Sequence, residues 1–337
     1  MVQRVSDHTN ILFTSAGRRV ELLIAFRRAY ASLGLQGNIV ALDTDPLAPA
    51  LRRADRPHIV PRISAPEYIP TLVEICRRER ISVIFPLIDP DVPVLAEHRD
   101  LLEATGARLA VVPLKAAAIA NDKWLTSQFF QSLGITTPKS WLPPDLDLDH
   151  IHYPLFIKPR RGSAAKSTYR VSNPRELQFF LDYVPDPVVQ EWMPGPEITN
   201  DVICDLDGDI LAVISRRRIE VRWGEVAKGV TIHDQSITDA CVRAAKALPA
   251  VGPITVQCMI KENAPYFTEI NARLGGGVPL GIAAGVDSPR YLLAKAAGIA
   301  TDIPPLGAYQ TGLYLTRFDS SYFLTEGDLG QVASHRI

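Results

Sequence analysis

Residues 266–277 read Tyr-Phe-Thr-Glu-Ile-Asn-Ala-Arg-Leu-Gly-Gly-Gly. The pattern is typical of a strand that runs into a glycine loop. Because side chains alternate between the two faces of a strand, we expect Phe267, Glu269, Asn271 and Arg273 to share one face. Mg²⁺ takes carboxylates and substrate phosphates as ligands, and an arginine beside them stabilises a phosphoryl group in transfer. The stretch therefore predicts a metal and phosphate site at the end of a strand.

The preceding residues, 254–260, predict the partner strand of a hairpin. Apolar and polar side chains alternate along it, and Gln257 lies on the polar side. If residues 261–265 form the connection, its odd length places Gln257 opposite Glu269, where it adds a third oxygen ligand. The hairpin alone also fits an ordinary half-buried ribbon with a solvated polar face, so both interpretations stay open at this point.

Length and composition indicate a globular protein of more than one domain. The chain has 337 residues, which suggests two or three domains, with 47% hydrophobic and 22% charged residues. A formal net charge of −1 counts against a nucleic-acid binder, which normally carries a basic excess. No apolar run is long enough to span a bilayer.

The N-terminus and the cysteines indicate a cytoplasmic protein. Residues 1–10 are polar and lack the apolar segment of a signal peptide. The four cysteines show no paired spacing, so we expect neither a disulfide framework nor a zinc site.

The first third of the chain alternates between strand and helix patterns. Strands are expected at residues 10–15, 38–42, 83–86 and 108–112, with helical segments between them. This alternation predicts a doubly wound parallel sheet with helices on both faces. A dinucleotide-binding loop would need three spaced glycines after the first strand, and residues 15–20 carry only one, which counts against NAD.

Two lysines lie where a phosphate site could use them. Asn121 or Asp122 suits a helix N-cap, which places Lys123 in the first helical turn. A strand at residues 153–157 ends in the basic loop 158–167, and such a loop can cover phosphates with backbone N–H groups and positive charge. A surface lysine and a mobile solvated hairpin are the alternatives.

The second half of the chain is richer in strands. A strand at residues 188–191 enters a connector with two prolines, whose unpaired backbone suits contact with the edge of a planar ligand. Residues 198–220 predict two long antiparallel strands, and residues 224–230 a glycine-punctuated segment. The motifs, in this order, resemble the ATP-grasp superfamily, and most of all the single-chain proteins similar to one half of the carbamoyl-phosphate synthase large subunit.

The resemblance covers residues 10–298 and implies a mixed α/β and α+β protein with an ATP-grasp fold. The expected parts are an N-terminal doubly wound parallel-sheet (pre-ATP-grasp) domain at residues 1–115, a lid subdomain with its linker at 116–187, and a C-terminal antiparallel-sheet subdomain at 188–337. ATP would lie between the last two.

The resemblance also implies roles for individual residues. The expected ATP contacts are Lys123 and Lys158 at the phosphates, Ser163 in the lid, Gln190, Glu191 and Met193 at the adenine edge, and Glu197 at the ribose. The expected metal ligands, for Mg²⁺ or for Mn²⁺ in its place, are Gln257, Glu269 and Asn271, and Arg273 would stabilise the transferred phosphoryl group.

Two departures from the family pattern concern the nucleotide site. The lid loop is usually glycine-rich, whereas Ala164 and Ala165 occupy it here, and their Cβ atoms restrict backbone conformations with positive φ. The position of Gln190 is often acidic in relatives, which puts its adenine contact in doubt.

The activity implied is that of an ATP-dependent carboxylate–amine ligase acting on a small metabolite such as an amino acid. An acylphosphate forms, an amine attacks it, and an amide or peptide bond, ADP and phosphate result. Lys228, with Arg216 or Arg218, is a candidate for binding the substrate carboxylate, and structural ion pairs are the alternative. A catalytically silent ATP-binding regulatory protein is the competing hypothesis. The implied partners are a small carboxylate and an amine, without nucleic acid or membrane, in a homodimer as is common among relatives.

Overall fold

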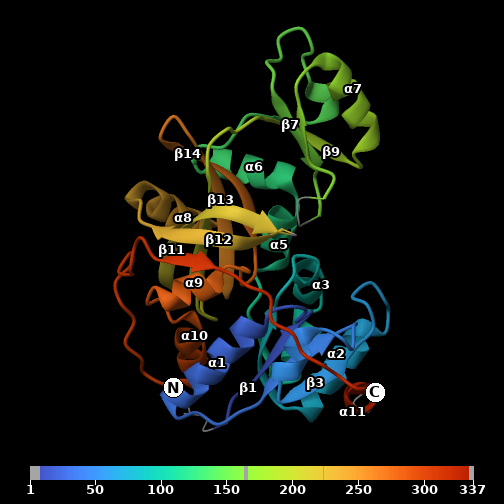
Figure 1. The fold of residues 1–337 in the computed structure, drawn as a ribbon, viewed down its shortest axis with the longest axis vertical. Coiled ribbons are helices and arrows are strands. Elements are labelled where there is room, and N and C mark those ends of the chain that lie inside the picture. The colour runs from blue at the N-terminus through green and yellow to red at the C-terminus, as the bar shows by residue number, and fades with distance from the viewer. Residues whose placement is uncertain (1–7, 163–165, 223, 334–337) are drawn as a thin grey trace.

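Three β-sheets follow one another along the long axis of the molecule (Figure 1). The computed structural model describes residues 8–162, 166–222 and 224–333, with side chains up to residue 329. The N-terminal sheet lies at one end, a six-stranded sheet in the middle and a small lid sheet at the other end. In this part of the chain no helix is long and apolar enough to cross a membrane.

The N-terminal domain is a five-stranded parallel sheet in the order β3-β2-β1-β4-β5. Its strands are β1 (Asn10–Thr14), β2 (Ile39–Asp43), β3 (Arg56–Ile59), β4 (Ile81–Pro86) and β5 (Arg108–Leu109). Its helices are α1 (Val20–Leu33), η1 (Pro49–Arg53), α2 (Tyr68–Arg78), α3 (Asp91–Glu97) and α4 (Arg99–Glu103).

Alternation along β1 explains why helices cover both faces of this sheet. Ile11 and Phe13 pack in one core cluster with Phe26 of α1, whereas Leu12 packs in another with Leu72 of α2. The doubly wound parallel sheet predicted from the sequence is confirmed. Its strand order reverses between β1 and β4.

The lid is a four-stranded antiparallel sheet in the order β6-β9-β7-β8. The helices α5 (Leu114–Asn121) and α6 (Lys123–Ser132) lead to it. It comprises β6 (Ser140–Trp141), η2 (Pro143–Asp145), β7 (Leu155–Pro159), β8 (Tyr169–Val171), α7 (Pro174–Tyr183) and β9 (Pro187–Glu191). Because β9 pairs with both β6 and β7, the expected domain limit at residue 187 cuts through the lid sheet, which extends to Glu191.

The C-terminal subdomain is a six-stranded sheet in the order β14-β13-β10-β11-β12-β15. It contains β10 (Glu197–Cys204), β11 (Ile210–Arg222), β12 (Glu225–Ile232), α8 (Gln235–Ala247), β13 (Pro253–Lys261), β14 (Ala264–Asn271), α9 (Val278–Ala283), α10 (Ser288–Ala297) and β15 (Tyr314–Thr316). The glycine-punctuated residues 224–230 lie mostly in strand β12, which pairs with β11 on one side and β15 on the other.

In the hairpin β13–β14, Gln257 pairs with Glu269 as predicted, but the turn is shorter than the five residues expected. Its turn is only two residues, Glu262 and Asn263, both with positive φ (53° and 63°), as a type I′ turn requires. A bulge between the 257–269 and 258–267 pairs then inserts Thr268 as an extra residue. The bulge restores the pairing of Gln257 with Glu269 and turns Phe267 to the buried side, so the expectation that Phe267 shares the polar face is wrong.

The hydrophobic core is shared between two parts of the molecule, whereas the lid has its own. Two clusters of buried side chains each combine residues of the N-terminal sheet with residues of the C-terminal subdomain. A third and smaller cluster, which includes Leu155, Ile157 and Val189, lies wholly within the lid. The N-terminal domain and the C-terminal subdomain therefore form one packed body, to which the lid is attached.

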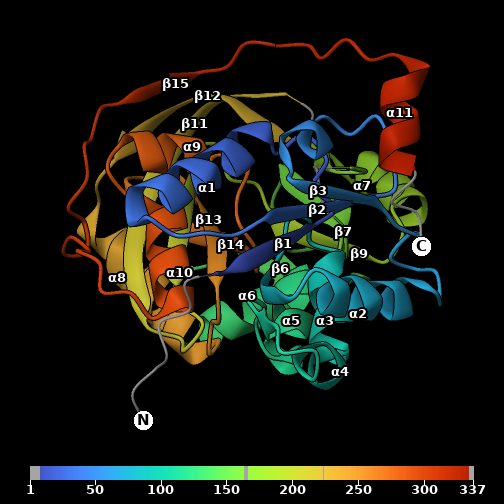
Figure 2. The ribbon, with the colours of Figure 1, turned by 90° about the horizontal axis from the view of Figure 1, so that it is seen from below.

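The last described segment returns to the N-terminal domain. Figure 2 shows it crossing from β15 to α11 (Glu326–Ala333), which lies beside β3. On the way Tyr322 accepts a 2.8 Å hydrogen bond from Arg53 Nε. Arg317 contacts Glu21 of α1 at 2.9 Å and the carbonyl of Gly276 at 2.6 Å. The segment thus ties the two halves of the body together.

Candidate active site between the lid and the C-terminal sheet

One cavity of about 460 Å³ gathers nearly all the residues singled out from the sequence. Its size is in the range of small-molecule sites. The predicted residues that line it are Lys123, Lys158, Gln190, Glu191, Met193, Glu197, Gln257, Glu269, Asn271 and Arg273. Ser163 lies outside the described residues, and Lys228 is not part of the lining.

The hairpin β13–β14 presents three oxygen-bearing side chains to the cavity. Gln257 pairs directly with Glu269, and Asn271 follows two residues later on the same face. Among the described residues no three or more His, Cys, Asp or Glu side chains form a metal-binding group. One carboxylate with two amide oxygens suits Mg²⁺, which binds few protein ligands and completes its shell with water and phosphate oxygens. The donor set therefore fits the predicted metal.

Lys158 provides an unneutralised positive charge beside this hairpin. Its side chain is buried, and Nζ donates a 3.2 Å hydrogen bond to Gln190 Oε1, whose amide nitrogen in turn donates to Ser140. None of the ion pairs among the described residues includes Lys158. Burial lowers the pKa of Lys158 to about 8, against the opposing attraction of Glu269. An anionic ligand would restore the lost stabilisation, so the arrangement favours phosphate.

The first turn of α6 holds the base of the lid loop. Asp122 caps the helix by accepting hydrogen bonds from the backbone of residues 124 and 125, and it also binds Arg160 at 2.7 Å. Lys123 donates from its backbone to the carbonyl of Arg160 and from Nζ to the carbonyl of Gly162 at 2.8 Å. Lys123 therefore lies at the base of the loop that begins after β7.

The connector after β9 forms another wall of the cavity. Glu191 pairs with Lys261, and Met193 is buried. Glu197, the expected ribose contact, accepts a 2.6 Å hydrogen bond from Arg218, which also lines the cavity. The side chain of Gln190 is engaged on both sides, since its Oε1 accepts from Lys158 and its Nε2 donates to Ser140.

Arg273 has a partner that sequence reasoning missed. Its Nη2 lies 2.8 Å from Oδ2 of Asp89, which also lines the cavity and comes from the loop after β4. The second oxygen of Asp89 and Nε of Arg273 are buried without a hydrogen-bond partner among the described residues. The signal available in the sequence was the position of Asp89 in the loop that follows a parallel strand, where such sheets bind ligands.

Arg216 is a structural residue. It forms two hydrogen bonds with Asp201, at 2.9 and 2.7 Å, and both side chains are buried. A Cβ atom on Gly277 would lie 1.7 Å from Arg216 Nη1, so this glycine is required for the pair to fit. Of the two interpretations of Arg216, the structure supports the ion pair.

Lys228 does not reach the cavity, so its expected catalytic role is not supported. It lies on strand β12, and Nζ is 2.7 Å from Oε2 of Glu220 on β11. The lysine side chain is half exposed, and the pair has the geometry of an ordinary cross-strand ion pair.

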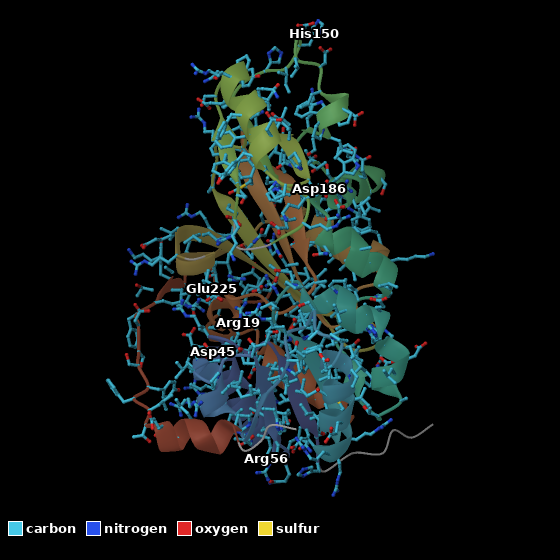
Figure 3. The ribbon with its side chains drawn as sticks, turned by 90° about the vertical axis from the view of Figure 1, so that its right-hand side faces the viewer. Arg19, Asp45, Arg56, His150, Asp186 and Glu225 are labelled. Atoms are coloured by element: carbon cyan, nitrogen blue, oxygen red, sulfur yellow. The ribbon has the colours of Figure 1, made fainter. Side chains whose placement is uncertain are left out.

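A second charged group lies where α1 meets the C-terminal subdomain. Figure 3 shows Arg19 and Glu225 facing each other there, and Arg19 Nη1 is 3.3 Å from Glu225 Oε1. Burial lowers the pKa of Arg19 to about 10, which leaves it charged at neutral pH; Glu225 acts against this shift, and Arg273 and Arg317 reinforce it. This group was also missed from the sequence.

Comparison with known proteins is consistent with this geometry. Residues 11–110 match the family described as PylC-like, N-terminal domain, and residues 120–277 match the family described as ATP-grasp domain. The D-alanine–D-alanine ligase of Fusobacterium nucleatum is 25% identical over 186 residues, which are 52% of this chain and 64% of that enzyme. D-alanine–D-alanine ligase A of Bacillus cereus is 26% identical over 236 residues, 60% of this chain and 77% of that enzyme.

The fold has solved counterparts as well. The L-amino acid ligase from Bacillus licheniformis superposes with a TM-score of 0.66 at 20% identity, over 86% of this chain and 74% of that one. This likeness concerns the fold.

Proposed function

Because the chain belongs to the ATP-grasp superfamily, we propose that it is an ATP-dependent carboxylate–amine ligase that joins two small molecules by an amide or peptide bond. The observation that carries the proposal is the meeting of Lys158, the three oxygen donors of β13–β14 and Arg273 in one cavity. The names of the D-alanine–D-alanine ligases and of the L-amino acid ligase support the same reaction type.

Different groups of residues along the cavity bind different parts of the ligands. Lys123 and Lys158 bind the phosphates of ATP from the lid side, while Glu191, Met193 and Glu197 border the nucleoside. Gln257, Glu269 and Asn271 would hold Mg²⁺, which when bound neutralises phosphate charge. Arg273, which follows the end of β14, binds the γ-phosphoryl group as it moves to the substrate.

The chemistry needs two displacements. A carboxylate oxygen of the first substrate attacks the γ-phosphorus, the bond to the bridging oxygen breaks, and ADP leaves. The amine nitrogen of the second substrate then attacks the acyl carbon, and the bond to the phosphate oxygen breaks. Of the two protons that the ammonium form gives up, one ends on the phosphate and the other is released. Closure of the lid sheet over the cavity would protect the acylphosphate from water.

Release of ADP is the test. Purified protein with ATP and Mg²⁺ is assayed against pairs drawn from a panel of carboxylic acids and amino acids, and at least one pair should give turnover above the ATP-only rate. Tight ATP binding without turnover for any pair would instead favour a silent ATP-binding regulatory protein.

A matched pair of variants tests the metal ligands. Glu269→Gln should lower kcat roughly 100-fold or more, because the only carboxylate of the predicted metal site is lost. Glu262→Gln removes a carboxylate from the exposed turn of the same hairpin and should leave the rate near wild type. Near-normal turnover in Glu269→Gln would rule out the metal assignment.

Assembly and location follow from the same proposal. The substrates are small molecules, and a cytoplasmic homodimer is the form we propose, by analogy with relatives. Light scattering during gel filtration measures the mass in solution and distinguishes a dimer from the 37.1 kDa monomer.

A further inference from the structure

The loop between β14 and α9 carries Arg273 into the cavity, and its backbone is held at every carbonyl from residue 273 to residue 277. The donors, in the order of these carbonyls, are Thr255 Oγ1 at 3.3 Å, Arg273 Nη1 at 3.2 Å, the N–H of Val278 at 3.4 Å, Arg317 Nη2 at 2.6 Å and the N–H of Leu280 at 3.0 Å. The path of this loop decides where the guanidinium of Arg273 lies.

Arg317 differs from the other donors to this loop. They belong to the hairpin, to the loop itself or to α9, whereas Arg317 is 41 residues away from Gly276 in the sequence. It directly follows β15, and its own N–H donates to the carbonyl of Ala227 on β12 at 3.0 Å. Its hydrogen bond to Gly276 is the shortest of the five and has a charged donor, which strengthens it.

The surroundings of Gly276 leave this carbonyl little room to move. A Cβ atom on Gly276 would lie 2.5 Å from Arg19 Nη1 and 3.1 Å from Glu225 Oε1, so the backbone passes close to both side chains. Glu225 is itself 3.4 Å from Arg317 Nη1. The middle of the loop is therefore enclosed by charged side chains, of which Arg317 supplies the hydrogen bond to its backbone.

We infer that Arg317 is a positioning residue for the proposed reaction, and that it acts through the carbonyl of Gly276 to hold Arg273 at the γ-phosphoryl group. The inference rests on the proposed ligase function. Asp89 holds the far end of the Arg273 side chain at 2.8 Å, while Arg317 holds the loop from which that side chain starts. Arg317 is not among the residues that line the cavity, so its effect on the reaction passes through the loop.

This inference gives a task to a part of the chain outside both family matches. The matched segments are residues 11–110 and 120–277, and Arg317 lies 40 residues beyond the second. A shift of about 1 Å at a reacting group, caused from outside the site, costs up to about 100-fold in rate. The residues after β15 are therefore part of the machinery that places the phosphoryl-binding arginine.

A tie between the two halves of the molecule is the competing explanation for Arg317. Its Nη2 is also 2.9 Å from Oε2 of Glu21 on α1, and a second tie joins Arg53 to Tyr322 at 2.8 Å. Glu21→Gln weakens the first tie and leaves the bond to Gly276 in place, and Arg53→Met removes the second. Neither Glu21 nor Arg53 lines the cavity, so both variants are matched controls.

Steady-state kinetics of the full-length protein separate the two explanations. Arg317→Met should lower kcat roughly 10- to 100-fold and leave KM for ATP within about twofold, because the lysines that bind ATP are untouched. Arg317→Lys should recover part of the loss, since an ammonium group still donates to a carbonyl. Both controls should stay within about twofold of wild type. Arg317→Met should remain folded, because Glu225 keeps Arg19 at 3.3 Å and Glu21 is largely exposed; thermal unfolding checks this.

A double variant tests whether the effect passes through Arg273. In the Arg273→Met background, Arg317→Met should lower kcat by less than about twofold further, because the group that it positions is already gone. A further loss as large as in the wild-type background would overturn the inference. So would a normal kcat in Arg317→Met, or equal losses in Arg317→Met and Glu21→Gln.

Hydrogen exchange gives a measurement that does not depend on turnover. Backbone amides of residues 274–280 should exchange with deuterium roughly tenfold faster in Arg317→Met than in wild type, while those of β1 and β7 should not change. Unchanged exchange in this loop, in a protein that releases ADP with a substrate pair, would overturn the inference and leave the ligase function standing. Faster exchange, in a protein that releases no ADP with any pair, would support the hold of Arg317 on the loop and contradict the ligase function.

Discussion

Two arginine–aspartate pairs lie beside the glycine run at residues 275–277, and they differ in what they leave unused. Arg216 and Asp201 make two hydrogen bonds with each other and are both buried. Arg273 and Asp89 make one, at the wall of the cavity, and each keeps a buried polar atom without a partner among the described residues. A pair whose atoms are all engaged holds the fold together, whereas a pair with spare atoms is able to bind a ligand.

The largest effect is expected from Arg273→Met. Loss of the guanidinium should lower kcat about 10³-fold or more, because a positive charge at the moving phosphoryl group acts mainly in the transition state. Stability should change little, since the pair is a single hydrogen bond between partly exposed groups. Steady-state ADP release and thermal unfolding measure the two quantities. A large drop in stability with a normal rate for the folded enzyme would abolish the contrast between the pairs.

The converse is expected for Arg216→Met. It leaves Asp201 buried without its partner and should reduce the free energy of unfolding by about 3–5 kcal/mol. The double variant Arg216→Met with Asp201→Leu should recover most of this loss, because neither charge remains buried alone. Urea unfolding of the single and double variants measures this recovery. Equal instability of both variants would show that shape, not charge, matters here.

Lys158, like the Asp89–Arg273 pair, has binding capacity that the fold leaves unused, and the pH dependence of kcat/KM for ATP tests its role. Burial holds its pKa at about 8, below the ordinary value, so the charged form that binds phosphate is lost as the pH rises through 8. The value of kcat/KM for ATP should therefore fall about tenfold per pH unit above that point. In Lys158→Arg the profile should be flat from pH 7 to 9, since a guanidinium stays charged there. A fall of the same size in this variant would assign the titration to another group.

A smaller effect is expected from Gln257→Glu. A second carboxylate in the predicted metal site should lower the Mg²⁺ concentration needed for half-maximal rate severalfold, because affinity for hard cations rises with ligand charge. Titration of activity with Mg²⁺ at fixed ATP measures it. Thr255→Ser, a conservative change next to the site on β13, serves as the control. An unchanged or higher requirement in Gln257→Glu would place the metal elsewhere.

The smallest effect is expected from Lys228→Met. The lysine is half exposed and paired with Glu220, so its loss should change stability by less than about 1 kcal/mol. The rate should stay within about twofold of wild type, since the residue lies outside the cavity lining. ADP release and urea unfolding suffice as measurements. A tenfold fall in kcat would return Lys228 to the site.

Most of the fold and the central residues of the site could be predicted from hydrophobic periodicity and from residues at strand ends. The polar face of Glu269 and Asn271, the N-cap at Asp122 and the parallel N-terminal sheet follow from local patterns, and the structure contains all three. The predicted pairing of Gln257 with Glu269 is also present. The turn is shorter than predicted, and the extra residue of the bulge compensates for the change in register that the shorter turn causes. A bulge depends on packing across strands, which explains why Phe267 was placed on the wrong face.

Contacts between residues far apart in the sequence could not be predicted from local patterns. Asp89 and Arg273 are 184 residues apart, and nothing near either one indicates the other. The same holds for Arg19, whose partner Glu225 lies on β12, far from it along the chain. The position of Lys228 outside the cavity lining also depends on distant pairing, because β12 lies between β11 and β15 in the sheet.

The separate core of the lid has a consequence for how the protein comes apart. Since Leu155, Ile157 and their neighbours pack only with one another, the lid can lose its order while the rest of the molecule stays folded. Backbone amides of β7 and β9 should therefore exchange with deuterium sooner than those of β1 or β13. A lid that folds as a module can also be transplanted from a homologue, which offers a route to altering nucleotide residence time without rebuilding the substrate pocket.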